Sequence, residues 1–589
     1  MGKNKDCVYT KGIFIIAWSL AVSVSAQPSL DEEAARQLIR EQQRNEVQLQ
    51  RQQEQTQQDI RLEGVPTQSA HDTIPDNETP CFPIHTITLT GEHAEPFQWL
   101  LHHVGPVGQS KASPIAEANP NDTVNAFLQN RCLGVTGINI IMARMQNALV
   151  EAGYITSRVV IANQDLREGT LGLTLVPGRI RDIQLSKQSF YRDILPLDTG
   201  RLLNLRDIEQ SLESLKRLPS VEADIQIIPA QSAHAKPGES DLDIQWEQGR
   251  PWRVVTTLDN AGSESTGVYQ GGITYAHDNL FGLHDILNLS YNHDVGGAEP
   301  LKGGTEAFGF NYSVPMGYWT AALNINANTY LQTVQGAFEQ IQYSGDSRSV
   351  SVDLSRLIER NSTRKITAGM NIWFRNSKNF VDDLEQVIQR RRTAGVEWSL
   401  DLRQFIGKAT LDGSLGYRKG TGMFDSLRAP EESLGEGTSR PTIIKSNLQL
   451  SVPFSLGTQR LNYTGSWRRQ HNRDPLTAQD RFSIGGRYTV RGFDGESTLA
   501  AERGWLVRND VSWYLGTSSH ALYLGVDYGR VNGFSEQFLI GDHLAGGALG
   551  IKGTLWGANY DLSFGVPINQ PDGFVTDSVA TYFSMNWAF

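Results

Sequence analysis

The 589-residue sequence has no long apolar run after its first 26 residues, and positive charge is not in excess. No stretch approaches the about 18 consecutive apolar residues of a membrane-spanning helix. The net charge is −11, whereas a nucleic-acid-binding domain usually carries a basic face. No G-x-x-x-x-G-K-[ST] segment is present, so the usual ATP-binding loop is missing. These absences count against a helical membrane protein, a nucleic-acid binder and a P-loop ATPase.

Cysteine is also scarce. Cys7 lies in the first 26 residues, which leaves Cys81 and Cys132. In an oxidising compartment an even pair of cysteines indicates one disulfide, and two unlinked thiols are the alternative.

The first residues have the pattern of a secretory signal peptide. A basic start precedes the apolar run GIFIIAWSLAVSV (12–24), and small residues occupy the −1 and −3 positions of a cut before Gln27. The alternative is a membrane-anchoring helix, for which the run is short. Residues 1–26 are therefore predicted to be removed from a chain that leaves the cytoplasm.

Residues 27–63 form a polar segment that is rich in helix-forming residues. Positions 29–63 contain ten glutamines and neither Gly nor Pro, but no continuous apolar stripe. A helix of about 30 residues is about 45 Å long, which is close to the thickness of a bilayer with its headgroups. One interpretation is a plug helix threaded through a water-filled pore; the other is a solvated polar arm. Residues 64–80, with three prolines, are predicted to be a linker.

Two small α+β modules are predicted next, at residues 81–178 and 179–250, because the order strand, helix, hairpin occurs twice. His102 and His103 invite a metal interpretation, but no Cys, Asp or Glu at ligand spacing supports it. In the first module the strand is expected at 82–91, helices at 96–104 and 134–154, and hairpin strands at 155–161 and 171–177. In the second module the strand is expected at 180–185, the helix at 205–218, and hairpin strands at 223–229 and 240–246.

From residue 251 to residue 589 the chain alternates between apolar and polar residues. In TAALNINANTY, for example, Leu323 and Ile325 share one face while Asn324 and Asn326 share the other. At about 20 residues per strand and connection, about 16 strands fit, and a barrel in lipid must close. A soluble sandwich also alternates, but its sheets rarely exceed about ten strands. The mean hydropathy of −0.35 is compatible with a barrel, whose strands carry polar residues at every second position.

The last strand alternates up to the C-terminal Phe589. An alternating strand that ends on Phe looks like the assembly signal of bacterial outer-membrane barrels.

The segment YTVRGFDGE (488–496) lies in a long connection between two predicted strands. If this loop folds into the lumen, Arg491 needs a carboxylate partner, because an unpaired buried charge costs several kcal/mol, on the order of 3–5. In ALYLGVDYGRV (521–531) the alternation places Asp527 on the lumen face, with Gly525 and Gly529 clearing space beside it. Asp527 is therefore the predicted partner; alternatively, it is one of many carboxylates that line an aqueous channel.

The neighbours of Arg491 fit a tight loop apex. Gly492 allows a backbone conformation that other residues avoid, and Phe493 is expected to wedge against the barrel wall. Val490, Arg491, Gly492, Phe493 and Asp527 together are the predicted lumen-loop lock.

These motifs resemble those of the two-partner secretion transporters, which share a superfamily with the Bam and Tam barrel insertases. VRGF (490–493), preceded by FSIGGRYT (482–489), looks like the signature loop of these transporters. GVDYG (525–529) resembles the superfamily's strand motif whose aspartate receives the loop arginine, although relatives commonly carry an aromatic residue in place of Gly525. DNLFGLHD (278–285) resembles an early barrel segment of the same transporters.

The resemblance implies a bacterial outer-membrane β-barrel of about 16 strands, preceded by two POTRA modules in the periplasm and a polar plug helix. It implies that the modules receive one large, unfolded secreted protein with an N-terminal secretion domain, which then crosses the barrel without ATP. Haemolysins, adhesins and contact-dependent inhibition toxins are the passengers of relatives. The other expected partners are outer-membrane lipid and the barrel assembly machinery, and the protein is expected to be monomeric.

Other functions remain as alternatives. A barrel insertase of the same superfamily usually has more periplasmic modules and no helix that fills the lumen. A porin or receptor has no need of periplasmic repeats. No Ser/His/Asp pattern or paired carboxylate stands out, so we expect no enzyme, no catalytic residue, no metal, no cofactor and no bound nucleic acid.

Overall fold

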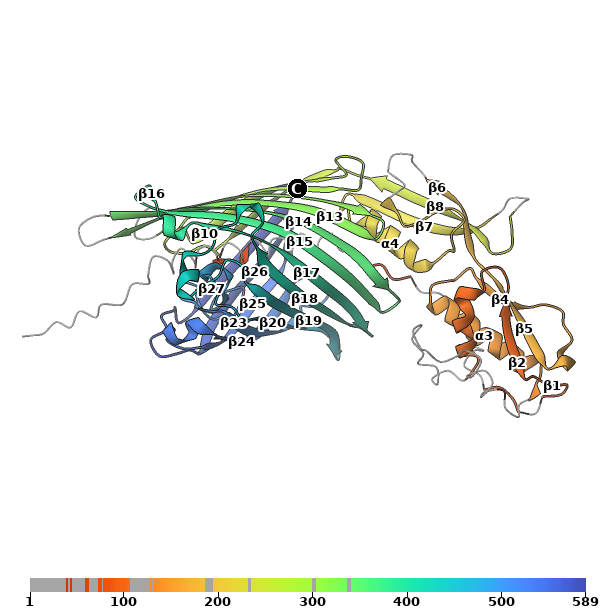
Figure 1. Ribbon diagram of the computed structural model, residues 1–589. Helices are drawn as coiled ribbons and strands as arrows, with labels where there is room; N and C mark the ends of the chain where they lie inside the picture. Colours follow the sequence, from red (N-terminus) through yellow and green to blue (C-terminus); the bar gives the residue numbers. More distant parts are fainter. Residues whose placement is uncertain are drawn as a thin grey trace, which may run out of the picture.

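A computed structural model gives the fold and describes residues 36, 39–40, 43–44, 59–62, 73–76, 78–105, 128, 132–185, 194–230, 235–298, 303–335 and 340–589. The predicted signal peptide (1–26) lies outside the described residues. So do most of the predicted plug helix (27–63) and most of the linker (64–80). A barrel and two smaller modules follow one another along the long axis of the molecule (Figure 1). We call the end of the barrel that meets the modules its module end, and the opposite end its far end.

Sixteen antiparallel strands close into the barrel, which confirms the predicted fold class. The alternating pattern dictates this closure, because a sheet with one apolar and one polar face can keep both faces satisfied in a membrane only as a closed ring. In chain order the strands are β9 (Trp252–Asp259), β10 (Tyr269–Asp278), β11 (Ile286–Gly296), β12 (Gly304–Met316), β13 (Trp319–Gln335), β14 (Gln340–Arg360), β15 (Arg364–Val381), β17 (Arg391–Ile406), β18 (Ala409–Thr421), β19 (Thr442–Leu456), β20 (Gln459–Asn472), β23 (Arg503–Tyr514), β24 (Ala521–Asn532), β25 (His543–Leu555), β26 (Ala558–Asn569) and β27 (Ala580–Ala588). The two-residue strand β16 (Leu384–Glu385) extends the pairing of β15.

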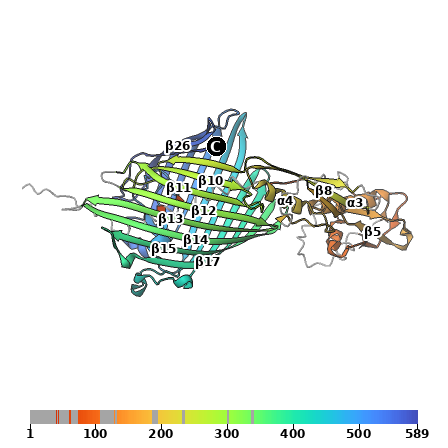
Figure 2. The same ribbon diagram turned by 90° about the horizontal axis from the view of Figure 1, so that it is seen from above.

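The barrel wall is uneven in height. Strands β13, β14 and β15 have 17, 21 and 18 residues and project past their neighbours at the far end (Figures 1 and 2). The closing pair of β27 and β9 matches only the five residues 584–588 with 255–259. The backbone of Phe589 continues this pairing by hydrogen bonds with Val254. The C-terminal residue thus lies at the module end of the closing seam, and its role in barrel assembly stays a prediction.

The first module packs helix α3 and the 3-10 helix η2 on a three-stranded sheet of order β2-β5-β4. The predicted strand at 82–91 is split, because β1 pairs with β3 while β2 joins the sheet. The predicted helix at 96–104 is a 3-10 helix. The elements are β1 (Phe82–Pro83), β2 (Thr86–Thr90), η2 (Glu95–His103), β3 (Cys132–Leu133), α3 (Val135–Glu151), β4 (Arg158–Ile161), η3 (Leu166–Glu168) and β5 (Thr170–Val176).

The second module repeats this plan with a sheet of order β6-β8-β7. Helix α4 buries Ile208, Leu212 and Leu215, at helical spacing, against the sheet. The Asn204 side chain accepts a hydrogen bond from the backbone N–H of Arg206 and so caps the start of α4. The elements are β6 (Arg179–Leu185), α4 (Leu205–Lys216), β7 (Val221–Pro229) and β8 (Glu239–Gln248).

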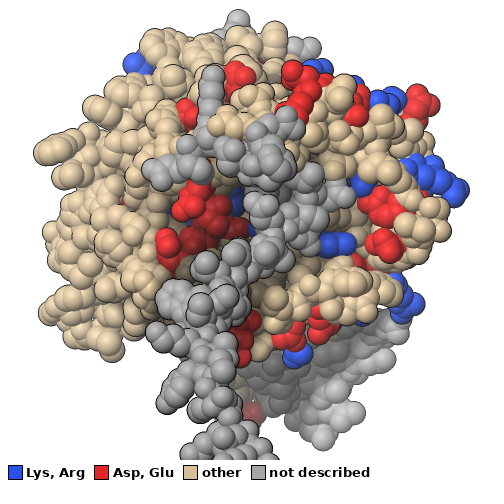
Figure 3. Space-filling view, turned by 90° about the vertical axis from the view of Figure 1, so that its left-hand side faces the viewer, with Lys and Arg blue, Asp and Glu red and all other residues tan. Residues whose placement is uncertain are grey.

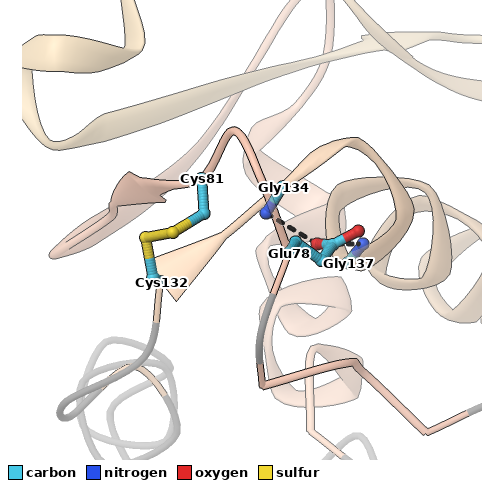
Figure 4. The surroundings of a disulfide bond; sticks show 5 residues. All are labelled: Glu78, Cys81, Cys132, Gly134 and Gly137. Carbon is cyan, nitrogen blue, oxygen red and sulfur yellow. Dashed lines mark hydrogen bonds between the residues drawn. A yellow bond between two sulfur atoms is a disulfide. The ribbon is translucent and has the colours of Figure 1, made fainter.

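In the first module a disulfide and a carboxylate lie side by side at the start of α3 (Figure 4). The sulfur atoms of Cys81 and Cys132 are bonded, so the two predicted cysteines form one bridge in the structure. Next to it, the Glu78 carboxylate accepts backbone N–H bonds from Gly134 at 2.7 Å, Thr136 at 2.8 Å and Gly137 at 3.0 Å. Glu78 therefore satisfies donors that the first turn of a helix leaves unpaired.

We expect Glu78→Gln to destabilise the first module by about 1 kcal/mol, as for the loss of a helix cap. Burial raises the pKa of the Glu78 carboxyl, but the hydrogen bonds from Thr136, Gly137 and Gly134 outweigh it and hold that pKa below its ordinary value. A depressed pKa contributes stability that is present above the ordinary carboxyl pKa of about 4.3 and is lost as pH falls through the folded-state value. Amide exchange at the start of α3 should thus differ between the two proteins at pH 7 and converge once the pH falls below the folded-state pKa of Glu78. Asp76→Asn, at an exposed position, is the control and should change nothing.

Candidate functional site

The connection between β20 and β23 folds back into the barrel. Within it, the short strands β21 (Phe482–Ile484) and β22 (Leu499–Ala501) pair with each other and hold the intervening segment as a compact hairpin. Its apolar side chains form a small core against lumen-facing residues of the wall. That core consists of Ile484, Val490, Phe493, Leu499, Ala501, Leu506, Val531, Leu544 and Phe574. The loop is therefore held by packing as well as by charge.

Arg491 makes the bonds that the sequence suggested. Its Nε lies 2.7 Å from Oδ2 of Asp527, its Nη2 lies 2.7 Å from Oδ1, and its backbone N–H donates to Oδ2 at 3.0 Å. The side chain of Asp527 is 1% exposed and that of Arg491 is 6% exposed. A buried bidentate pair of this kind fixes both position and orientation.

A second carboxylate, which sequence reasoning missed, completes the site. Nη2 of Arg491 also lies 2.7 Å from Oδ1 of Asp510 on β23, and Nε of Arg508 lies 3.8 Å from Oδ2 of Asp527. Two arginines and two aspartates thus share one cluster, in which Arg491 and Asp527 are buried and Arg508 and Asp510 are partly exposed. The alternation of β23 places Asp510 on the lumen face, but only the strand register, which sets Asp510 opposite Gly525, brings it to Arg491.

Glycines lie on both sides of the contact between the loop apex and the barrel wall: Gly492 in the loop, and Gly525 and Gly529 on β24. Gly492 has φ 107°, and a Cβ on it would lie 2.5 Å from the Val566 carbonyl oxygen. A Cβ on Gly525 would lie 2.4 Å from Nη2 of Arg491, and one on Gly529 would lie 2.8 Å from Val490 Cγ2. These are the glycines that the sequence pointed to, and each lies in contact with the loop.

Two further wall glycines were not predicted. A Cβ on Gly546 would lie 1.8 Å from the Arg491 carbonyl oxygen, and one on Gly565 would lie 2.8 Å from the Gly492 backbone nitrogen. Both are on neighbouring strands, β25 and β26, whose approach to the loop depends on barrel curvature.

Phe493 and Tyr582 hold the other side of the apex. Phe493 is fully buried, with its ring edge-on to Phe574 at 5.5 Å between centroids. The Tyr582 hydroxyl accepts from the Gly492 N–H at 3.0 Å and donates to the Phe493 carbonyl oxygen at 2.7 Å. Tyr582 faces inward on β27, which the C-terminal alternation indicated, although its role at the loop was not foreseen.

Five described residues of the polar segment 27–63, between positions 36 and 44, lie beside this loop. All five are helical: Arg36, Ile39, Arg40, Gln43 and Arg44. The first four line a cavity of about 160 Å³ together with the loop and the lumen wall, and Arg44 lies one helical turn after Arg40. These five residues lie inside the barrel, while the assignment of the whole segment 27–63 as a plug helix stays a prediction.

Three arginines on this helical face make the contacts. Arg36 donates to the Glu496 carbonyl oxygen at 3.1 Å, Arg40 to the Gly495 carbonyl oxygen at 2.7 Å, and Arg44 to Gln270 Oε1 at 3.1 Å. Arg40 also lies 3.7 Å from the Glu496 carboxylate. Figure 3 views the far end, where acidic side chains gather around its hollow. The arginine face of the helix is thus complementary in charge to the loop tip.

DNLFGLHD (278–285) forms the joint between the barrel and the second module. Asp278 is buried, accepting from Arg253 Nη1 at 2.7 Å and from the backbone N–H of Ser220 at 3.1 Å. The Asp285 carboxylate accepts from the N–H groups of Phe281 and Leu283, which closes the turn. This segment positions the module rather than the loop.

Within the described residues, no helix is long and apolar enough to cross a bilayer. Among the same residues, no group of three or more His, Cys, Asp or Glu side chains is placed to bind a metal ion.

Comparisons with known families agree with this architecture. Residues 238–553 match the family described as haemolysin secretion/activation protein ShlB/FhaC/HecB. Residues 110–178 match the ShlB-type POTRA domain, and residues 179–229 match a second POTRA domain.

Individual relatives match along two thirds or more of the chain. The outer membrane transporter CdiB-2 of Burkholderia pseudomallei is 32% identical, over 97% of this chain and 98% of the relative. The hemolysin transporter protein ShlB of Serratia marcescens is 24% identical, over 69% of this chain and 71% of the relative. The solved structure of CdiB from Acinetobacter baumannii superposes with a TM-score of 0.80 at 26% identity, covering 94% of this chain and 99% of that one.

Proposed function

This chain belongs to the family of haemolysin secretion/activation proteins ShlB/FhaC/HecB, and from that premise we propose that the lumen helix, held by the docked loop, keeps the export pathway closed until a partner protein arrives. The protein is an outer-membrane transporter of two-partner secretion, with its POTRA modules in the periplasm. The module end of the barrel is therefore periplasmic, and the far end is extracellular. Members of the family are transporters.

One observation carries the proposal: Arg491 is buried between Asp527 and Asp510 inside a closed barrel. Such a cluster is stable only while all its members are paired, because breaking one pair leaves a buried charge alone at a cost of about 3–5 kcal/mol. The loop thus has a strongly preferred docked position. We therefore expect the lumen helix, which contacts the loop tip, to be the part that moves when the pathway opens. The passage used by the partner is the lumen that the helix vacates.

The partner in this proposal is one large secreted protein with an N-terminal secretion domain, delivered unfolded from the periplasm. The match to CdiB-2 over 97% of the chain favours a contact-dependent inhibition toxin over a haemolysin or an adhesin. Recognition of an unfolded chain is expected to use backbone bonds, which tolerate many sequences. Folding outside the cell supplies the direction of transport. The transporter acts as a monomer that the barrel assembly machinery inserts into lipid.

The test is secretion of the protein encoded next to this gene, in a host that lacks both genes. Export should require this chain, and deleting both POTRA modules should abolish trapping of a stalled partner in the barrel. Other outer-membrane barrels should keep normal levels in a knockout. Loss of many barrels would favour the insertase, and a steadily large conductance of the intact protein would favour the porin.

A separate prediction concerns the lumen helix. Replacing Arg36, Arg40 and Arg44 together with glutamine removes its charged contacts to the loop tip and to Gln270. At about 1 kcal/mol for each bond in a wet lumen, we expect at least tenfold more frequent large openings in planar bilayers. Gln43→Ala on the same helical face is the control and should behave like the unmodified protein. Unchanged opening in the triple variant would mean that these contacts do not hold the helix.

A further inference from the structure

Residues 59–62, with the sequence DIRL, run between the second POTRA module and the periplasmic rim of the barrel, and we call them the strap. They are outside any helix or strand, and their exposure alternates: Ile60 and Leu62 are half-buried, whereas Asp59 and Arg61 are exposed. In Figure 1 the helix on one side of the strap, α4, lies against the ends of the barrel strands. The strap is therefore an extended segment whose two faces meet two different domains.

Its backbone is held by side chains of both domains. The N–H of Ile60 donates to Glu213 Oε1 at 2.8 Å, and the N–H of Leu62 donates to Glu209 Oε1 at 2.7 Å, both on α4. Arg360 Nη2, at the periplasmic end of β14, donates to the Ile60 carbonyl oxygen at 2.7 Å. Three polar groups of the main chain, two on Ile60 and one on Leu62, are thus recognised without reference to residue type.

The even-numbered and odd-numbered side chains of the strap face different domains. Ile60 and Leu62 pack against the apolar core of the second POTRA module. On the barrel side, Asp59 pairs with Lys365 at 3.0 Å and Arg403 at 2.7 Å, and Arg61 lies over the ring of Phe405 at 4.1 Å. The site therefore selects an extended chain with apolar residues two apart and tolerates a flanking charge.

The receiving site is complete without the strap. Arg360 pairs directly with Glu209 at 3.0 Å and with Glu213 at 2.8 Å, with its own side chain 4% exposed. Arg403 pairs with Asp412 at 2.6 Å, and Lys365 with Glu213 at 2.7 Å. None of these ion pairs involves the strap, so the charged groups that receive it are held in position by one another.

We propose that the cleft between α4 and the periplasmic ends of β14, β15 and β17 binds an extended segment of the exported protein, and that the strap occupies it in the resting transporter. This inference rests on the proposed function and names where the unfolded partner is received at the mouth of the pore. Backbone recognition suits it, because an exported chain presents many sequences in turn. The strap is a tethered competitor whose effective concentration, on the order of millimolar, keeps stray peptides out.

The first test uses a labelled peptide of residues 57–64, QQDIRLEG, added to the full-length protein. In the unmodified transporter the strap should block binding. In the variant Ile60→Asp with Leu62→Asp the strap loses its apolar contacts, and the peptide should bind at least tenfold more tightly. A peptide that carries the same two substitutions is the control and should bind neither protein. Equal binding of the peptide to both proteins would overturn the inference; heat-dependent electrophoretic mobility verifies that the barrel has assembled.

The second test separates this inference from export itself. Phe405, whose ring contacts Arg61, is replaced by the photocrosslinker p-benzoylphenylalanine. Without the partner, irradiation should join position 405 to the strap; with a partner stalled during export, the crosslink should move to the partner. A crosslink that stays on the strap while secretion proceeds would overturn the cleft proposal and leave the exporter proposal intact. Absence of secretion in every variant and in the unmodified protein would instead count against the exporter.

Discussion

Arg491→Ala should reduce export to less than about one-tenth while the barrel still assembles. The substitution takes the bidentate partner from the buried carboxylate of Asp527, which keeps only Arg508 at 3.8 Å, and it takes the ion-pair partner from Asp510. At about 3–5 kcal/mol for an unpaired buried charge, the docked loop loses more than a hundredfold in population relative to displaced positions. Secretion of the partner and single-channel recordings measure the effect. Heat-dependent mobility of the folded barrel shows that assembly is intact.

Arg487→Ala is the matched control, since it removes an arginine of the same loop. Arg487 donates to Asn260 Oδ1 at 3.2 Å and to the Phe583 carbonyl oxygen at 3.1 Å. Its loss therefore leaves no buried carboxylate unpaired, and we expect a much smaller decrease in export than for Arg491→Ala. Arg491→Lys should fall between the two, because an ammonium keeps the charge but not the bidentate geometry. Normal export by Arg491→Ala would show that transport does not need the lumen-loop lock.

The charged neighbours of the pair also decide how much export an exchange of Arg491 and Asp527 restores. Arg491→Asp combined with Asp527→Arg appears balanced when the pair is considered alone. In the structure, however, the new aspartate would face Asp510, and the new arginine would face Arg508, which lies 3.8 Å from Asp527. Like charges at such distances are unfavourable. We therefore expect only partial recovery from the swap, and more when Asp510→Asn is added.

Strand parity is the part of the site that the sequence could supply. Along β24 every second side chain is buried, and Asp527 falls on the inward set with Gly525 and Gly529. This follows from the period of two, which fixes the face of every residue once one residue is assigned. The segment 490–493 resembles a known loop, and this resemblance directed attention to Arg491. Parity and motif together bring Arg491 and Asp527 into the same small region.

Contacts across strands and domains were beyond the reach of the same reasoning. Asp510 is opposite Gly525 only because of the register between β23 and β24, and a shift of one residue would turn it outward. Gly546 lies next to the β-bulge between Ala545 and Gly546, and such irregularities have no reliable sequence signal. The strap was included within a longer polar segment, because four residues carry too little periodicity to stand out. These features depend on three-dimensional closure, not on local pattern.

Gly546→Ala should impair export nearly as strongly as Arg491→Ala, although it removes no charge and adds a single methyl group. The added Cβ would lie 1.8 Å from the Arg491 carbonyl oxygen and 3.3 Å from the Gly492 Cα. Since real contacts of a Cβ essentially never fall below 3.0 Å, the loop apex must retreat by about 1 Å or more. A retreat of that size lengthens the bonds between Arg491 and Asp527 from 2.7 Å to beyond hydrogen-bonding distance.

The neighbouring glycine makes this prediction specific to the loop. A Cβ on Gly547 would meet Ile568 Cδ1 at 3.4 Å, an ordinary contact on the outer face of the same strand. Both substitutions have the same effect on the entropy of the unfolded chain, so a difference between them reports the contact with the loop. We expect export by Gly547→Ala to be normal and export by Gly546→Ala to fall at least tenfold, with both barrels assembled. Equal export by the two variants would show that the loop apex does not need its place against β25, and the docked arrangement would then be irrelevant to transport.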